Sequence, residues 1–312
     1  MSTAVWPSLA PDALKKAEDD STARELAWLL DSLQETLASL KSGLEECYAL
    51  LAPIEPGSTL VISSPRSESI KGHITRVGTR IVKGTLALRL RTHPPLNLTL
   101  NPTHPLLLNP LTTLRTLLNQ SLDMVAITRW TGDRHSALFI SSQLHLLHSL
   151  LLEAISVLKG PNLLTPVHSA ESGTSTPIPA TPGQAWFESP PDPETFTPPL
   201  PSTLSLHLTL LESSLLLTLR VLEPTSIQQT PMSRFALAIG AQRRLEHDEM
   251  DEVFVYRGEE VRVREKVRVE GSADPSLLSL GAKLGALERT VAERRKGLEV
   301  LMGVGEDTDG DD

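Results

Sequence analysis

The feature that most restricts how this chain can fold is a leucine repeat with alternating spacings of three and four residues. Its first occurrence is unbroken and occupies Leu26, Leu30, Leu33, Leu37, Leu40, Leu44, Cys47 and Leu51. This spacing places the apolar side chains on one stripe of an α-helix, which other helices have to cover. Because Thr22 and Glu25 have the spacing of a capping box, the helix is predicted to begin at Thr22 and to end before Pro53.

Three further segments have the same helical spacing. The second is predicted to begin at Asn109, the third to end at Gly160 and the last to begin at Asp274. Only Arg294 interrupts the last stripe. The apolar positions are Leu111, Leu114, Leu118, Leu122 and Val125; then Leu144, Leu147, Leu151, Ala154 and Leu158; and finally Leu277, Leu280, Leu284, Leu287, Val291, Leu298 and Leu301.

Between the first two helical segments the apolar spacing changes to two residues, which is the period of a β-strand. The alternation is clearest at Leu86, Leu88, Leu90, Leu96, Leu98 and Leu100. Residues 58–101 are therefore predicted to form an antiparallel meander with one solvated face.

The same period returns in the second half of the chain. Residues 204–210 and 215–221 are predicted to form a hairpin that turns at Glu212, Ser213 and Ser214. Val253–Tyr256 and residues 261–269 are predicted to form a second strand pair around Gly258.

These elements predict an α+β protein, in which an antiparallel helical bundle is joined to a separate antiparallel β domain in an elongated two-part molecule. The bundle is assigned to residues 21–52, 105–160 and 273–303, and the β domain to residues 58–101 and 203–271. Residues 161–202 are rich in proline, serine and threonine and are predicted to be a linker or long loop. Residues 1–20 are predicted to be a flexible N-terminus and residues 304–312 an acidic tail.

The net charge and the lengths of the apolar runs predict a cytoplasmic protein and argue against nucleic-acid binding and membrane insertion. The net charge is −9, and no stripe of lysine and arginine interleaved with aromatic residues is present, so no nucleic-acid partner is expected. The N-terminus lacks the pattern of a secretory signal. His145, His148 and Glu153 interrupt the richest leucine run, so no direct membrane insertion is expected. The single cysteine, Cys47, is expected to be a buried thiol of a cytoplasmic protein.

No familiar catalytic motif is present in the sequence, so the chain is expected to be neither an enzyme nor a cofactor carrier. One alternative is a metal-dependent hydrolase of unrecognised type, which would use either of two groups of residues. The groups are His145 and His148 near Glu153, and the acidic run Glu246, Asp248, Glu249, Asp251 and Glu252. A second alternative is a coiled-coil trafficking tether, which would have to self-associate through its helices.

The most distinctive surface candidate is the strand at 261–269. Alternation predicts that Val261, Val263, Val267 and Val269 share one face and that Arg262, Arg264, Lys266 and Arg268 share the other. One interpretation is an edge strand that charge protects from aggregation. The functional interpretation is a docking face for an acidic partner, made by these four cations.

Several short motifs resemble the Rogdi / RAVE subunit 2 family in the same order along the chain. They are Glu25-Leu26-Ala27-Trp28-Leu29-Leu30; Ile70-Lys71-Gly72 with Thr75 and Gly78; Leu163-Leu164-Thr165-Pro166; Pro199-Leu200-Pro201 before residues 204–210; and Gly240 with Gln242, Arg243, Leu245 and Glu246. The resemblance extends over most of residues 22–302. The proline-rich insert, the charged segment 243–270 and the acidic tail depart from animal-like members.

The resemblance implies a non-catalytic subunit that works with a large β-propeller scaffold. Together they would promote assembly of the peripheral sector of the V-type proton ATPase with its membrane sector. It also implies a helical domain joined to a β domain, no cofactor, and recruitment from the cytoplasm to vacuolar or endosomal membranes through partners.

Overall fold

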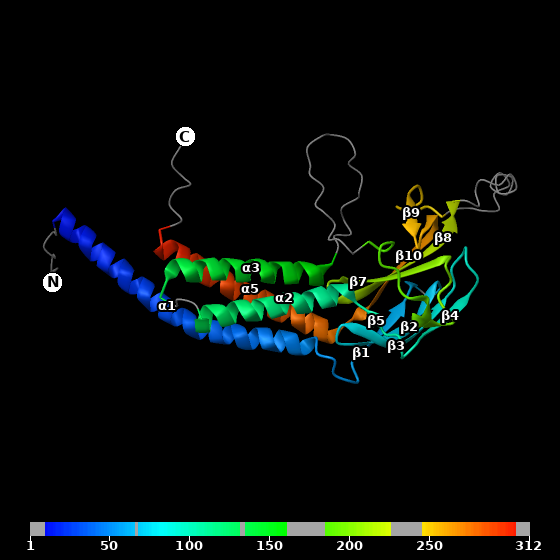
Figure 1. Cartoon of the computed structure of the whole chain (residues 1–312), viewed down its shortest axis with the longest axis horizontal. Coiled ribbons are helices and arrows are strands. Elements are labelled where there is room, and N and C mark those ends of the chain that lie inside the picture. Colours follow the sequence, from blue (N-terminus) through cyan, green and yellow to red (C-terminus); the bar gives the residue numbers. More distant parts are fainter. Residues whose placement is uncertain (1–9, 66–67, 132–134, 161–184, 226–244, 304–312) are drawn as a thin grey trace, which may run out of the picture. The chain divides into compact units, whose positions relative to one another are not determined.

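The structure, a computed structural model, describes residues 10–65, 68–131, 135–160, 185–225 and 245–303 (Figure 1). Residues 161–184 of the predicted linker, the predicted acidic tail and the motifs at 163–166 and 240–243 lie outside these ranges.

The chain divides into two compact units. The helical unit consists of Met1–Ala49, Thr116–Ile155 and Ala282–Asp312, and the sheet unit consists of Leu50–Arg115 and Ser156–Gly281. Long helices in one unit and an antiparallel sheet in the other confirm the predicted α+β class with a separate β region.

Four α-helices lie within the described ranges (Figure 1). They are α1 (Pro11–Leu50), α2 (Asn109–Ala126), α3 (Ala137–Lys159) and α5 (Pro275–Leu301), and a π-helical turn, η2 (Ile127–Thr131), follows α2. The predicted helices are therefore all present, and α3 ends directly before Gly160 as predicted.

The predicted start of the first helix is wrong. α1 begins at Pro11, so residues 11–20, predicted to be flexible, are helical. Thr22 does not cap the helix, because its hydroxyl donates to the carbonyl of Glu18 inside it at 3.0 Å. Proline is favoured in the first turn of a helix, and the following residues contain no glycine, so the helix continues upstream of the capping-box pattern.

The leucine stripes form the core of the helical unit. The buried side chains of α1 are Leu29, Leu30, Leu33, Leu37, Leu40, Leu44 and Cys47. α5 packs closely on α1, since a Cβ atom built on Gly43 would lie 2.7 Å from Leu287 Cδ2. α3 contacts α5 where His148 Nε2 lies 2.9 Å from Glu288 Oε1. These stripes are therefore covered by helices of the same chain.

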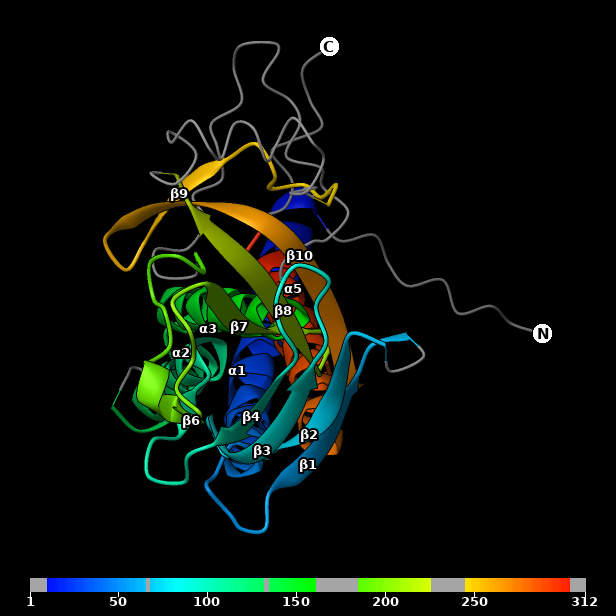
Figure 2. The same cartoon turned by 90° about the vertical axis from the view of Figure 1, so that its right-hand side faces the viewer.

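The described strands form one ten-stranded antiparallel sheet (Figures 1 and 2). Its order is β6-β4-β3-β2-β1-β10-β8-β7, with β5 beside β3 and β9 beside β10. The strands are β1 (Ser58–Ser63), β2 (Ile70–Val77), β3 (Arg80–Leu88), β4 (Leu96–Leu100), β5 (Leu106–Leu107), β6 (Phe196–Thr197), β7 (Leu204–Leu211), β8 (Ser214–Pro224), β9 (Val253–Tyr256) and β10 (Glu259–Ala273). The two predicted strand blocks join where Ile62 of β1 pairs with Gly271 of β10.

Part of the predicted linker is ordered structure. β6 pairs with β4, and Phe196 and Trp186 are only 4% and 6% exposed. The high proline content predicted a loop, but the aromatic side chains in this stretch bury enough apolar surface to hold it against the sheet.

A buried ion pair holds the start of α5 to the sheet. Asp274, which is fully buried, accepts hydrogen bonds from the amides of Ser276 and Leu277 at 2.9 and 3.4 Å, so it caps the helix. Its other carboxylate oxygen accepts from Arg76 Nε at 2.6 Å. This pair connects the C-terminal helix to β2 within the sheet unit.

Candidate functional site

A β-bulge in β10 separates the four cations that the sequence placed on one face. Val263 pairs with Leu222 of β8 and Glu265 pairs with Val221, so Arg264 is an extra residue on β10. Beyond this bulge Lys266 pairs with Arg220, which lies on the same face of β8 as Leu222. Lys266 and Arg268 therefore share a face with Val261 and Val263, and the predicted alternation through this strand is wrong.

The prediction that this strand is an edge is also wrong. β10 pairs with β8 on one side and with β9 and β1 on the other. Its charges therefore have another role than protecting a sheet edge.

Two of the four cations bind an acidic segment of the same chain. Lys266 Nζ donates to both carboxylate oxygens of Asp248 at 2.7 Å and to Glu249 at 2.6 Å. Arg268 reaches Asp248 at 3.1 Å. Arg220 of β8 binds Glu249 with two hydrogen bonds of 2.6 and 2.8 Å. We call these five side chains the ion network.

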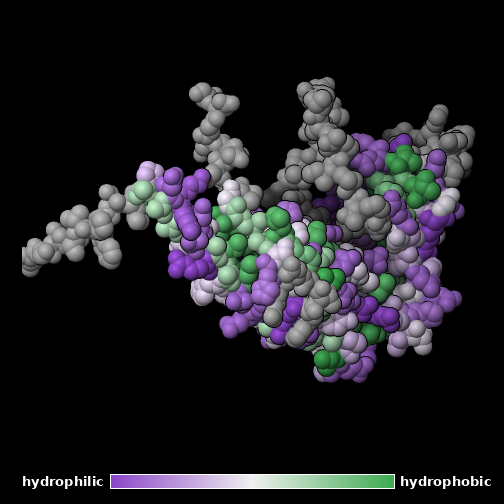
Figure 3. Space-filling model, turned by 60° about the vertical axis from the view of Figure 1, so that its left-hand side comes forward, coloured by the Kyte–Doolittle hydropathy of each residue, from purple (hydrophilic) through white to green (hydrophobic). Residues whose placement is uncertain are grey.

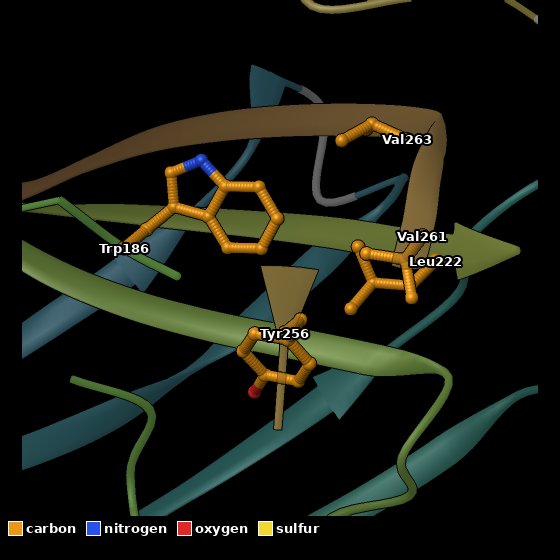
Figure 4. Packing of buried hydrophobic residues seen from close by; sticks show 5 residues of the cluster. All are labelled: Trp186, Leu222, Tyr256, Val261 and Val263. Carbon is orange, nitrogen blue, oxygen red and sulfur yellow. The ribbon is translucent and has the colours of Figure 1, made fainter. Parts of the chain in front are cut away.

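An aromatic cluster lies beside the ion network on the same face of β8 and β10. Trp186, Leu222, Tyr256, Val261 and Val263 are buried together (Figure 4). The Arg220 guanidinium lies 4.6 Å from the centre of the Trp186 ring, within the range of a cation–π contact. Trp186 therefore covers a cation that Glu249 also neutralises.

The ion network shifts the pKa values of its carboxylates. Burial acts to raise the pKa of Glu249, but hydrogen bonds and charges from Arg220 and Lys266 outweigh it and hold that pKa below its usual value. The pKa of Asp248 is lowered in the same way, by Lys266 and Arg268 against the effect of burial. Nearby, burial and the charge of Arg220 lower the pKa of His207 to about 4. Both carboxylates are charged and His207 is neutral near neutral pH.

Arg262 and Arg264 remain as candidate partner contacts from the predicted docking face. Their Nε atoms are buried and donate to no atom in the part of the chain that the structure describes. Sequence reasoning missed Arg220 and Trp186 as members of the face. The opposite charges of residues 248 and 249 and of the nearby cations could have suggested their pairing. The sequence contains no comparable signal for the bulge that orients Lys266.

The histidine pair is close together but faces an arginine. Arg295 Nη1 lies 3.4 Å from His145 Nδ1 and 3.3 Å from His148 Nδ1, and His148 Nε2 lies 2.9 Å from Glu288. Because arginine only donates, the Nδ1 atoms act as acceptors here, and the Nε2 atom of His148 is assigned as the donor to Glu288. A metal cation at these histidine nitrogens would be repelled by the positive charge of the Arg295 guanidinium. Among the described residues, no group of three or more His, Cys, Asp or Glu side chains is placed to hold a metal.

Large apolar side chains are exposed near one end of the helical unit. The most exposed large ones are Leu138, Trp28 and Val300, at 75%, 71% and 67%. Along α1, Gly43 lies against Leu287 and Glu46 pairs with Lys283; along α3, His145 lies near Arg295 and His148 near Glu288. Both helices therefore run antiparallel to α5. Because each helix rises by the same distance per residue, counting from these contacts places Trp28 and Leu138 near the level of the last turn of α5, where Val300 lies. In the view of Figure 3, hydrophobic surface is visible among the hydrophilic surface of the helices.

By length and composition alone, α3 is apolar enough to cross a membrane. His145, His148 and Glu153 interrupt the leucine run of this helix, but the hydropathy averaged along the helix stays high. One side of α3, with Leu144, Leu147 and Leu151, is buried within the chain, and the other exposes Leu146 and Leu152.

Comparison with known proteins identifies the family. The family model described as Rogdi leucine zipper containing protein matches residues 25–299, which include most of both units. No curated protein matches the chain. The family match extends over the leucine stripes, the sheet and the ion network alike, and the chain therefore belongs to the Rogdi leucine zipper family.

Proposed function

We propose that this chain is a non-catalytic adaptor of a RAVE-like complex that promotes assembly and reassembly of the V-type proton ATPase. It would bring the peripheral sector of the pump onto its membrane sector and so support vacuolar and endosomal acidification. The observation that carries the proposal is membership of the Rogdi family over residues 25–299.

In this proposal the partners are a large β-propeller scaffold subunit and subunits of the peripheral sector. The chain acts in the cytoplasm and reaches vacuolar or endosomal membranes through these partners. Surface chemistry supports a binding role, because Trp28, Leu138 and Val300 expose large apolar side chains at a similar level of the helical unit.

The direct test is affinity purification of the tagged full-length chain from its own cytosol. Associated proteins are identified by mass spectrometry before and after treatment that detaches the peripheral sector. The proposal expects a propeller scaffold and pump subunits to copurify, with more pump subunits after detachment. Recovery of neither class of protein would contradict it.

Charge reversal tests whether the remaining cations of β10 contact a partner. Arg262→Glu with Arg264→Glu is expected to reduce recovery of the acidic partner, because these two cations have no carboxylate partner among the described residues. The matched control is Arg289→Glu with Lys296→Glu, two exposed cations on α5. Equal recovery with both double variants would remove Arg262 and Arg264 from the interface.

A further inference from the structure

β9 is an edge strand with little protection. It pairs with β10 on one side, and no other described strand pairs with it. Its sequence, Val253-Phe254-Val255-Tyr256, has high β-propensity and contains none of the lysine or proline residues that usually block a sheet edge.

The turn geometry determines which backbone groups of β9 point outward. Arg257 and Gly258 form a two-residue turn with φ values of 52° and 84°, and Tyr256 pairs with Glu259 across it. In such a hairpin the residues next to the turn exchange both hydrogen bonds, and the bonding pairs then alternate. Val253 and Val255 therefore direct their N–H and C=O groups away from β10.

The neighbouring strand provides a check on this assignment. Val255 pairs with Glu260, so the backbone groups of Glu260 should face β8 rather than β9. The carbonyl of Glu260 does so, since it accepts a hydrogen bond of 3.1 Å from Thr225 at the end of β8.

The side chains at these two positions are exposed as well. Val253 is 46% exposed and Val255 is 58% exposed, whereas Tyr256 is 2% exposed and belongs to the aromatic cluster. The same two residues therefore present apolar side chains together with backbone groups that no other described strand pairs with. This combination is what an added strand requires, because backbone bonds supply affinity and alternate side chains supply specificity.

The surrounding charge indicates the chemistry of the occupant. Asp251, Glu252, Glu259 and Glu260 are all exposed around β9. Arg257, which donates to the carbonyl of Pro191 at 2.8 Å, and Arg262, which pairs with Val253, offset two of these four negative charges. The surface around β9 therefore remains acidic on balance, which favours a segment with basic residues. A four-residue strand also buries far less than the roughly 1,200 Å² of a stable protein dimer, which disfavours a second copy held by this edge alone.

We propose that β9 is a β-augmentation site, to which a partner protein adds an extended segment of β-branched residues flanked by lysine or arginine. The added strand would bind the outward backbone groups of Val253 and Val255 and cover their side chains. This inference goes beyond the adaptor role, because it concerns the chemistry that the sheet edge binds and does not require a proton pump.

The test uses a fluorescent peptide with a Val-Thr-Val core flanked by two lysines on each side, titrated with the full-length chain and followed by anisotropy. Binding is expected to weaken with added salt. A matched peptide with glutamates in place of the lysines is expected to bind about tenfold or more weakly. Equal binding of the two peptides, or none to the lysine peptide, would overturn the proposal.

Two changes test the backbone contacts. Val255→Pro removes an outward N–H without removing a bond to β10, and it is expected to weaken lysine-peptide binding about tenfold. If this variant fails to fold by circular dichroism, N-methylation of the central residues of the peptide tests the same contacts with the unaltered chain. The control Val255→Thr keeps the outward N–H and a β-branched side chain, and it is expected to bind the lysine peptide as the unaltered chain does. Unchanged binding with both the proline variant and the methylated peptides would show that binding does not occur by strand addition.

Discussion

Backbone geometry leaves little freedom at Gly160. It ends α3 with φ of +77°, and a Cβ atom there would lie 1.9 Å from the carbonyl oxygen of Leu210. Gly160→Ala is expected to destabilise the chain by at least about 2 kcal/mol, because a left-handed conformation is unfavourable for alanine and the carbonyl must also move. Denaturant unfolding measures the difference in the free energy of unfolding.

The control for that substitution is Gly285→Ala in α5, where a Cβ atom would meet nothing within 4 Å. Helix propensity predicts that this change is neutral or stabilises by roughly 0.5–1 kcal/mol. A similar loss of stability in the two variants would mean that the backbone conformation at Gly160 does not cause the destabilisation.

Cys47 is expected to be unreactive in the folded chain. Burial raises the pKa of its thiol to about 11 from an ordinary 9.0, although Lys283 acts in the opposite direction. The thiolate fraction at pH 8 is then about a hundredfold lower than in the unfolded chain. Iodoacetamide labelling followed by mass spectrometry should be slow in native buffer and fast in urea. Rapid native labelling would show that Cys47 is not held in the leucine core.

At the scale of the elements, the Asp274–Arg76 pair connects α5 to β2. Arg76 is 3% exposed and Asp274 is fully buried, so removal of one partner leaves the other charge without compensation. Asp274→Ala is expected to cost about 3–5 kcal/mol, because it removes a buried ion-pair partner and a helix cap together. Thermal and urea unfolding provide the measurement.

An exposed ion pair is the appropriate comparison. Lys41 and Glu45 on α1 lie 3.8 Å apart, with side chains 37% and 58% exposed. Glu45→Gln is expected to change stability by less than about 0.5 kcal/mol, since solvent screens such pairs. If the two substitutions had equal effects, the buried pair would not hold the two elements together.

The ion network and His207 make the stability of the sheet unit depend on pH. The pKa of His207 is lowered to about 4 from 6.5, so between these values the unfolded state binds more protons than the folded state. Stability is therefore complete above pH 6.5 and falls as the pH decreases towards 4. Below about 4.5 the lowered pKa values of Glu249 and Asp248 add a further loss in the same direction.

His207→Gln separates the two contributions. It is expected to remove roughly 2 kcal/mol of the pH-dependent loss between pH 6.5 and 4, while the loss at lower pH remains. Urea unfolding at a series of pH values measures both. A His207→Gln curve that matched the original chain between pH 6.5 and 4 would exclude the histidine as the source.

At the scale of the whole molecule, the adaptor proposal and the metal-dependent hydrolase alternative predict different effects of metal removal on stability. The histidine nitrogens face Arg295, and Asp248 and Glu249 are occupied by Lys266, Arg220 and Arg268. Treatment of the purified full-length chain with EDTA is therefore expected to leave its melting temperature unchanged. Stoichiometric zinc by elemental analysis, lost together with thermal stability on chelation, would support the hydrolase instead.

Most of the elements were predictable from the sequence, because helix and strand periods are local properties of the chain; β5 and β6 were not predicted. The leucine spacing predicted all four helices, and the period of two predicted both strand blocks and the hairpin at residues 204–221. Local patterns were less reliable at boundaries, where the Thr22–Glu25 spacing suggested a cap inside what is a longer helix, α1.

Local patterns could not predict which side chains meet across the sheet. A single extra residue, Arg264, shifts the register of β10 and moves Lys266 to the face of Arg220 and Trp186. Strict alternation could not predict this shift, because a bulge arises from pairing with β8 rather than from the strand's own sequence. The same pairing made β10 a central strand and left β9 at the edge, since strand order depends on contacts between residues far apart in the chain.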